Sequence, residues 1–336
     1  MKTHAHILAR GSLRSEHGSK GFTLIELMIA IAMGISIIAG LSVYLLNNLA
    51  NSRTNERVTE LQINSRYALN SIRQELLHAG NLAYTSAAPS APRTSLGTLT
   101  SECLETGAPA GSFVSNVGQA VWGSNNSNPF SSNCIPSANT IAGEDVLVVR
   151  RLADTSTSTS LLNTNTVYFA SSYPQGEPFR GSNTPSFVIT SPLENFPIQI
   201  YVYYISPYTV SANEVPAIPA LYRLALDSTG TMTPQLVVSG IEHFQVQYSS
   251  FDTAGITRYY DTIAGNSYLP ATGAAIGSNW DNVNAVRIWL LARNATPEPG
   301  YTNTTTYAMG DQSYTVNDSY QRQLLTSVIR LRNRGR

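Results

Sequence analysis

A single carboxylate, Glu26, lies near the start of a long apolar stretch. No other side chain between Phe22 and Arg53 is charged, and the run from Phe22 to Leu46 contains 25 residues. A helix of that length spans roughly 38 Å, which exceeds the ~30 Å hydrocarbon core of a bilayer. A carboxylate inside hydrocarbon costs on the order of 2.5 to 3.5 kcal/mol, so Glu26 marks a functional position with a partner. The alternative is an ordinary membrane anchor with Glu26 at the headgroup level.

Few other residues have the chemistry of a catalytic or metal site. Beyond residue 21 the chain has two histidines, His78 and His243, and two cysteines, Cys103 and Cys134. No G-x-S-x-G, P-loop or G-x-G-x-x-G sequence accompanies them, and these four residues make a poor zinc site. The oxygen atoms of residues 281–284 are too few for a calcium loop. We therefore predict no catalytic residue, metal or cofactor, with a membrane-anchored periplasmic enzyme that uses His243 as the remote alternative.

The charge distribution gives the apolar segment an orientation. Residues 1–21 contain four basic residues and one acidic residue, whereas the rest of the chain has 17 arginines, 20 acidic residues and no lysine. Positive charges before the span and mixed charges after it place residues 1–21 in the cytoplasm and the bulk of the chain outside the membrane. An ordinary secretory signal is cut after its apolar region. A cut before the apolar region, after Gly21, would instead leave the anchor on the mature protein.

The sequence of residues 21–26, GFTLIE, resembles the processing site of type IV prepilins and of the pseudopilins of type II secretion. The resemblance implies that a prepilin peptidase cuts after Gly21 and methylates the new amino terminus at Phe22. It also implies that Glu26, the fifth mature residue, pairs with the Phe22 amine of a neighbouring subunit during assembly. Two charges in an apolar helix bundle are tolerable only as such a pair.

Residues 22–79 contain no proline and are predicted to form one helix, with residues 22–46 spanning the membrane and residues 47–79 amphipathic. Gly34 and Gly40 each lower helix propensity by ~1 kcal/mol, so this part is expected to loosen in a filament. Gly80-Asn81 is the predicted end of the helix. The stripe predicted to pack on the globular domain consists of Val58, Leu61, Ser65, Ala68, Leu69, Ile72 and Leu76. Arg57, Glu60, Arg66 and Arg73 are expected to face water.

Residues 80–336 are predicted to form a β-rich head, which gives an α+β fold with a long helix packed on a large antiparallel sheet. Strands with one apolar face are expected at 145–150, 166–170, 198–205, 221–226, 235–248, 284–290 and 324–331. The polar faces would carry the exposed tyrosines Tyr201, Tyr203, Tyr259 and Tyr260, which either contact a partner or sugar or, more commonly, pack.

Residues 82–142 are rich in Ser, Thr, Asn, Pro and Gly and show little periodicity. They are interpreted as a long surface excursion, either a partner contact or, as we prefer, a tolerated insertion. An oxidising periplasm favours a disulfide between Cys103 and Cys134, which would stabilise the head by roughly 3 to 4 kcal/mol. The alternative is two free buried thiols.

Four later segments resemble, in the same order, the PilW-type minor pilins of type IV pili: residues 221–226, 237–248, 280–293 and 321–333. They resemble the J-type minor pseudopilins of type II secretion more loosely. The resemblance covers the first eighty residues and most of the chain after Val202. It implies a minor pilin that primes pilus assembly and lies at or near the tip, supporting adhesion, twitching motility or DNA uptake.

The same resemblance implies the partners and the location of the chain. The partners would be other minor pilins, the major pilin, a PilY-type tip adhesin, the prepilin peptidase, the inner-membrane assembly platform and, before assembly, membrane lipid. The chain would reside in the bacterial inner membrane with its head in the periplasm, and then in the pilus at the cell surface.

Nucleic acid is a different class of partner to consider. Arg330, Arg332, Arg334 and Arg336 form a small basic cluster at the end of the chain. The mature part has more acidic than basic residues, which makes it a poor phosphate binder overall. Solvated or partner-facing arginines on an edge strand are the favoured interpretation.

Overall fold

The computed structural model describes residues 21–85, 96–97, 99, 101–104, 108–183, 185, 192–251, 256–263 and 279–333. The chain divides into two compact units, residues 1–55 and residues 56–336. The predicted leader, apart from Gly21, lies outside the described residues, as do Arg334 and Arg336.

The first unit contains the start of helix α1 (Leu24–His78), and its apolar side chains are exposed on every face of the helix. The predicted apolar run is therefore helical without a break, through Gly34 and Gly40. By length and composition, α1 is the one helix among the described residues that can cross a membrane. Ser36 and Ser42 donate their hydroxyl groups to the carbonyls of Ala32 and Ile38 at 2.9 and 2.8 Å, so these polar groups are satisfied within the helix.

In the second unit, α1 is amphipathic as predicted. Its buried residues are Leu61, Ser65, Ala68, Ile72 and Leu76, which recur at helical spacing, and Val58 and Leu69 are half-buried beside them. The helix ends at His78, close to the predicted position. Gly80 follows in the left-handed conformation, with φ of 72°, and its N–H donates to the carbonyl of Arg150 at 2.9 Å.

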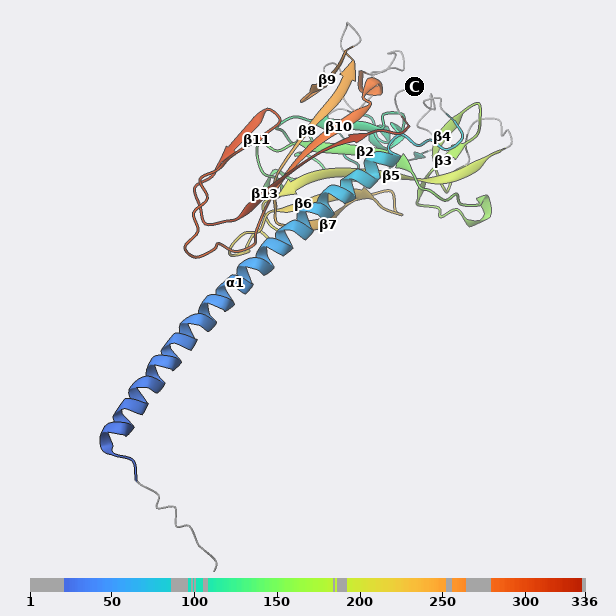
Figure 1. Ribbon diagram of the computed structural model, residues 1–336. Coiled ribbons are helices and arrows are strands. Elements are labelled where there is room, and N and C mark those ends of the chain that lie inside the picture. The colour runs from blue at the N-terminus through green and yellow to red at the C-terminus, as the bar shows by residue number, and fades with distance from the viewer. Residues whose placement is uncertain are drawn as a thin grey trace, which may run out of the picture. The chain divides into compact units, whose positions relative to one another are not determined.

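The described part of the head contains two sheets and a hairpin, and all of the strand pairs within it are antiparallel (Figure 1). The seven-stranded sheet has the order β1-β2-β5-β3-β4, with β6 on β5 and β7 on β6. Its strands are β1 (Val121–Ser124), β2 (Val146–Leu152), β3 (Val167–Ser171), β4 (Gly176–Arg180), β5 (Glu194–Ser206), β6 (Ala220–Leu226) and β7 (Met232–Ser239). The predicted α+β fold is confirmed.

The second sheet has four strands in the order β13-β10-β8-β9. They are β8 (Ile241–Phe251), β9 (Thr257–Tyr260), β10 (Ala285–Arg293) and β13 (Arg322–Arg330), while β11 (Thr306–Met309) and β12 (Gln312–Thr315) form the hairpin. The remaining elements are short: α2 (Ser112–Ser115), η2 (Ser137–Asn139), η3 (Thr159–Leu161) and η4 (Asn279–Asn282).

The predicted single strand over 235–248 is wrong, because β7 and β8 belong to different sheets. Gly240 separates them in the left-handed conformation, with φ of 80°. A residue with a side chain is strained there, and the glycine lets the chain leave one sheet and enter the other.

The prediction that Tyr201 and Tyr203 are exposed is also wrong. Glu75 of α1 contacts Arg151 of β2 at 2.5 Å and Arg223 of β6 at 3.9 Å, so α1 covers this face of the larger sheet (Figure 1). Tyr203 is 0% exposed and Tyr201 is half-buried. Tyr259 and Tyr260 are half-buried as well, and the guanidinium of Arg287 stacks on the Tyr259 ring at 3.9 Å.

The interpretation of residues 82–142 as a surface excursion is wrong for much of that segment. The guanidinium carbon of buried Arg150 lies 4.7 Å from the ring centroid of Phe113, and Arg150 donates to Gln119 at 3.3 Å. Arg150 and Arg151 are consecutive in β2, so their side chains point to opposite faces of the sheet. Arg151 contacts α1, and residues of the 82–142 segment therefore cover the opposite face, on which Arg150 lies. The core residues that it supplies include Leu96, Leu99, Phe113, Val114, Val117, Trp122, Phe130 and Ile135.

The structure has the predicted disulfide between Cys103 and Cys134, with a Cα–Cα distance of 5.2 Å. Cys103 is fully buried and Cys134 packs against the same core. The disulfide therefore joins two ends of a segment that is part of the core.

Candidate functional site

The first candidate site is the start of α1, where Thr23 and Glu26 form a reciprocal cap. The backbone N–H and the hydroxyl of Thr23 both donate to Glu26 Oε2 at 2.9 Å, and the Glu26 N–H donates to the Thr23 hydroxyl at 3.3 Å. This is the capping-box arrangement, in which a threonine and a glutamate three residues later satisfy each other's free donors. The helix consequently begins at Leu24, and Gly21, Phe22 and Thr23 precede it.

The cap engages only one oxygen atom of Glu26. Within the described part of the chain, Glu26 Oε1 has no hydrogen-bond partner, and the residue is exposed. Phe22 is 88% exposed, and Leu24 and Ile25 are also largely exposed. The start of α1 therefore presents one unpaired carboxylate oxygen within an apolar surface, an arrangement that can accept a cationic group from another helix.

A second cluster of polar residues surrounds His243. Its Nδ1 lies 2.6 Å from Glu144 Oε1, and its ring stacks on Tyr314 with the centroids 3.6 Å apart. Glu144 Oε2 accepts the N–H of Phe244 at 2.6 Å. Among the described residues, no Ser, Thr or Cys bonds with His243, so its contacts there are a carboxylate partner and a stacked ring rather than a nucleophile–base pair.

The cluster joins the two sheets. Asp145 is buried and accepts the N–H of Asn126 at 2.8 Å and that of Val246 at 2.7 Å. One edge of β8 pairs with β10 and the other with β9, but β9 pairs only from Tyr248 onward. At Val246 the second edge of β8 therefore has no described strand beside it. The carboxylates of Glu144 and Asp145, which immediately precede β2, thus replace a neighbouring strand.

These acidic groups predict a pH dependence of stability. Burial, together with the nearby charges of Asp311 and Glu144, raises the pKa of Asp145 to about 7 despite its two backbone hydrogen bonds. The pKa of Asp145 is thus higher in the folded protein than in the unfolded chain, where it is near 3.8. The contribution of Asp145 to the free energy of unfolding is therefore fully present below pH 3.8 and is lost as the pH rises through about 7. Between pH 5 and pH 8, the free energy of unfolding should fall by about 2 to 3 kcal/mol.

Urea titrations of the full chain in detergent, followed by tryptophan fluorescence at each pH, measure this slope. Asp145→Asn should remove at least half of this pH dependence. The rest would come from Glu144, which the variant retains and whose pKa is also raised by burial. Asp154→Asn is the matched control, since that side chain is 66% exposed. An Asp145→Asn variant with the full wild-type slope would contradict the assignment.

Two comparisons with protein families match different parts of the chain. Residues 17–42 match the family model described as the prokaryotic N-terminal methylation motif. Residues 202–333 match the family model described as type IV pilus-assembly protein W, PilW. Over residues 202–333, somewhat more than a third of its length, the chain is similar to the PilW family. No match was found among curated proteins or solved structures.

The methylation motif contains the Thr23–Glu26 cap, and the PilW match extends from β5 to Asn333, three residues after the end of β13. The two matches support a type IV pilin-like role in pilus assembly. The methylation motif and the apolar helix fit membrane anchoring and a location in the pilus.

The basic residues near the end of β13 lie beside a pocket. Arg330 and Arg332 line it together with Arg73 of α1, which is exposed as predicted. Sequence reasoning did not connect Arg73 with this cluster, because 259 residues separate it from Arg332. Over the described ranges, no group of three or more His, Cys, Asp or Glu residues is placed to hold a metal ion.

Proposed function

We propose that a prepilin peptidase cuts the chain between Gly21 and Phe22 and methylates the amine of Phe22. The accessibility of this bond supports the proposal. Gly21 and Phe22 precede the first helical residue and are exposed, and no described residue other than a chain neighbour has an atom within 4 Å of the position that a Cβ of Gly21 would occupy. A peptidase can therefore approach the bond without unfolding α1.

The proposed mature chain uses Glu26 for assembly. The observation that carries this proposal is that the two oxygen atoms of Glu26 differ in their contacts. Oε2 caps its own helix, whereas Oε1 has no hydrogen-bond partner among the described residues. The Phe22 amine of a neighbouring subunit is the cation that Oε1 would receive. An isolated carboxylate in an apolar bundle is costly, whereas a hydrogen-bonded pair offsets much of that cost.

The domain organisation follows from this processing. Residues 1–21 would be a leader that is removed, residues 22–46 would span the inner membrane, and residues 47–79 would form the amphipathic part of the helix. Residues 80–336 would form a head in the periplasm and later at the cell surface. The charges before and after the apolar run support this orientation.

In the pilus, the head would act with other minor pilins and a PilY-type adhesin to prime assembly and to occupy a position at or near the tip. The PilW match supports a role in assembly, and the size of the head supports the tip, where bulk obstructs no subunit above it. The work of the chain would be structural, with no catalytic residue.

Mass spectrometry of the protein isolated from cells tests the proposal. The expected amino-terminal peptide begins at methylated Phe22, and the apolar helix is retained. A protein that begins at Met1, or one trimmed beyond the apolar helix, would overturn it.

A further inference from the structure

The last strand of the smaller sheet has one edge without a partner. Among the described residues β13 pairs only with β10, and the N–H of Leu331 donates to the carbonyl of Asn284 at 2.9 Å. In an antiparallel pair, alternate residues bond to the same neighbour, so the backbone groups of Thr326, Val328 and Arg330 point away from β10. The side chain of Val328 is also 51% exposed. This free edge is able to pair with an extended segment of another chain.

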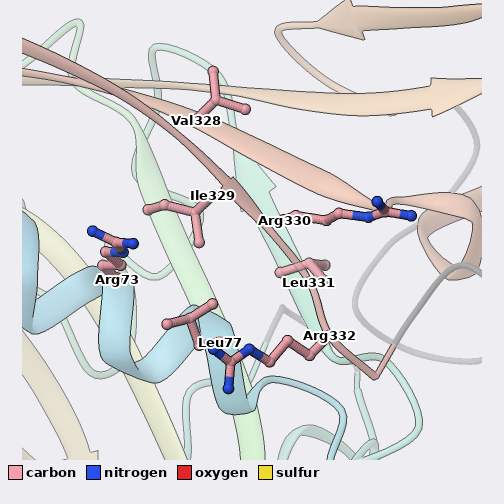
Figure 2. A pocket seen from close by; sticks show the side chains of 7 residues that line it. All are labelled: Arg73, Leu77, Val328, Ile329, Arg330, Leu331 and Arg332. Carbon is pink, nitrogen blue, oxygen red and sulfur yellow. The ribbon is translucent and has the colours of Figure 1, made fainter.

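A pocket of about 450 Å³ lies at the end of this edge, between β13 and the last turns of α1. Figure 2 shows Arg73 and Arg332 on the side of β13 that faces α1, with the apolar side chains of Leu77, Ile329 and Leu331 between them. Arg330 extends from the other face of the strand in the same view. The pocket thus combines an apolar floor, backbone groups and positive charge.

The three arginines of the pocket lack the partners that other arginines of the head have. Arg151 and Arg223 contact Glu75, and Arg322 contacts Glu242 and Asp318. In contrast, no hydrogen bond or ion pair to a described residue involves the side chain of Arg73, Arg330 or Arg332. Three unpaired guanidinium groups at one strand edge favour a ligand that carries several carboxylates.

We propose that the β13 edge and this pocket bind an acidic, extended segment of another protein, which adds to the smaller sheet as a strand. Its backbone would pair with Val328 and Arg330. Because successive residues of a strand point to opposite faces, neighbouring acidic residues would reach Arg73 and Arg332 on one face and Arg330 on the other. That the other protein is a subunit of the pilus rests on the proposed function.

Nucleic acid fits the same surface less well. A phosphate backbone would use the arginines, but it would not use the free strand edge or the apolar floor formed by Leu77, Ile329 and Leu331. The mature chain also has more acidic than basic residues, which opposes non-specific binding of a polyanion.

Fluorescence anisotropy with the purified full chain in detergent micelles tests the proposal. The probe is a labelled ten-residue peptide of alternating Thr and Val with three successive glutamates at its centre. Arg73→Ala and Arg332→Ala should each weaken binding about tenfold, as expected for loss of a charge-assisted contact. Methylation of alternate backbone nitrogens of the peptide should weaken binding by a similar factor, because those N–H groups would pair with β13.

Arg66→Ala is the matched control, since Arg66 lies two turns before Arg73 on the same side of α1, is exposed and is outside the pocket. That variant should bind as the wild type does. Absence of binding, equal binding of the peptide with glutamine in place of glutamate, or tighter binding of a single-stranded oligonucleotide of equal charge would overturn the proposal. The measurement involves neither processing nor a pilus, so its failure is distinguishable from a failure of the proposed function.

Discussion

Replacing Glu26 with alanine should leave processing intact and reduce the amount of the protein in purified pili by at least tenfold. The physical reason is the Phe22 amine of the neighbouring subunit, which would be left without a partner inside the helix bundle. Removal of one member of a buried ion pair costs about 3 to 5 kcal/mol, because the remaining charge is uncompensated. Immunoblots of sheared pili and of whole cells, combined with mass spectrometry of the amino terminus, measure incorporation and processing separately.

Two variants distinguish pairing from the other effects of the change. Glu60→Ala removes an exposed glutamate of the same helix and should not affect incorporation. Thr23→Ala removes the cap but keeps the carboxylate, and loss of such a cap costs about 1 kcal/mol of helix stability. If Thr23→Ala reduces incorporation as strongly as Glu26→Ala, the function of Glu26 is to cap its own helix, and the proposed pair is wrong.

Replacing Gly21 with serine or a larger residue should block cleavage and leave an unmethylated precursor about two kilodaltons heavier than the mature protein. This position has room for a side chain among the described residues, since none of them apart from the chain neighbours has an atom within 4 Å of the Cβ position. A loss of cleavage would therefore arise in the peptidase complex, where a close approach to the backbone requires glycine, and not from misfolding.

Gel mobility and intact mass of the membrane fraction measure this result. Gly34→Ala is the matched control, because Gly34 has equally open surroundings and lies outside the processing site. It should be cut and methylated normally. Normal processing of the Gly21 variants would show that the cut does not occur after this residue.

The sequence predicted those parts of the fold that depend on local periodicity. The buried stripe of α1 and strands β5, β6, β10 and β13 follow from helical spacing or alternation. The prediction of exposed tyrosines in β5 was wrong because burial of Tyr203 depends on α1, which is distant in sequence. One local signal was available: the continuous apolar run of residues 146–149 in β2 is typical of a strand covered on both faces.

The candidate sites divide in the same way. Gly21, Phe22 and Glu26 form a motif within six residues, so spacing alone was sufficient to select them. The contact between His243 and Glu144 joins residues 99 positions apart, and the arginine pocket joins α1 to the end of β13. Neither grouping has a local pattern, since each depends on the packing of strands against one another and against α1.

The double contact of Glu75 has a mechanical consequence for a subunit that is held by its helix and bears load on its head. Glu75 bonds to Arg151 on β2 and to Arg223 on β6, and both strands pair with β5. A pull along α1 would therefore reach β2 and β6 together and, through their backbone pairing, β5 between them. A contact with one edge strand would instead load that strand alone.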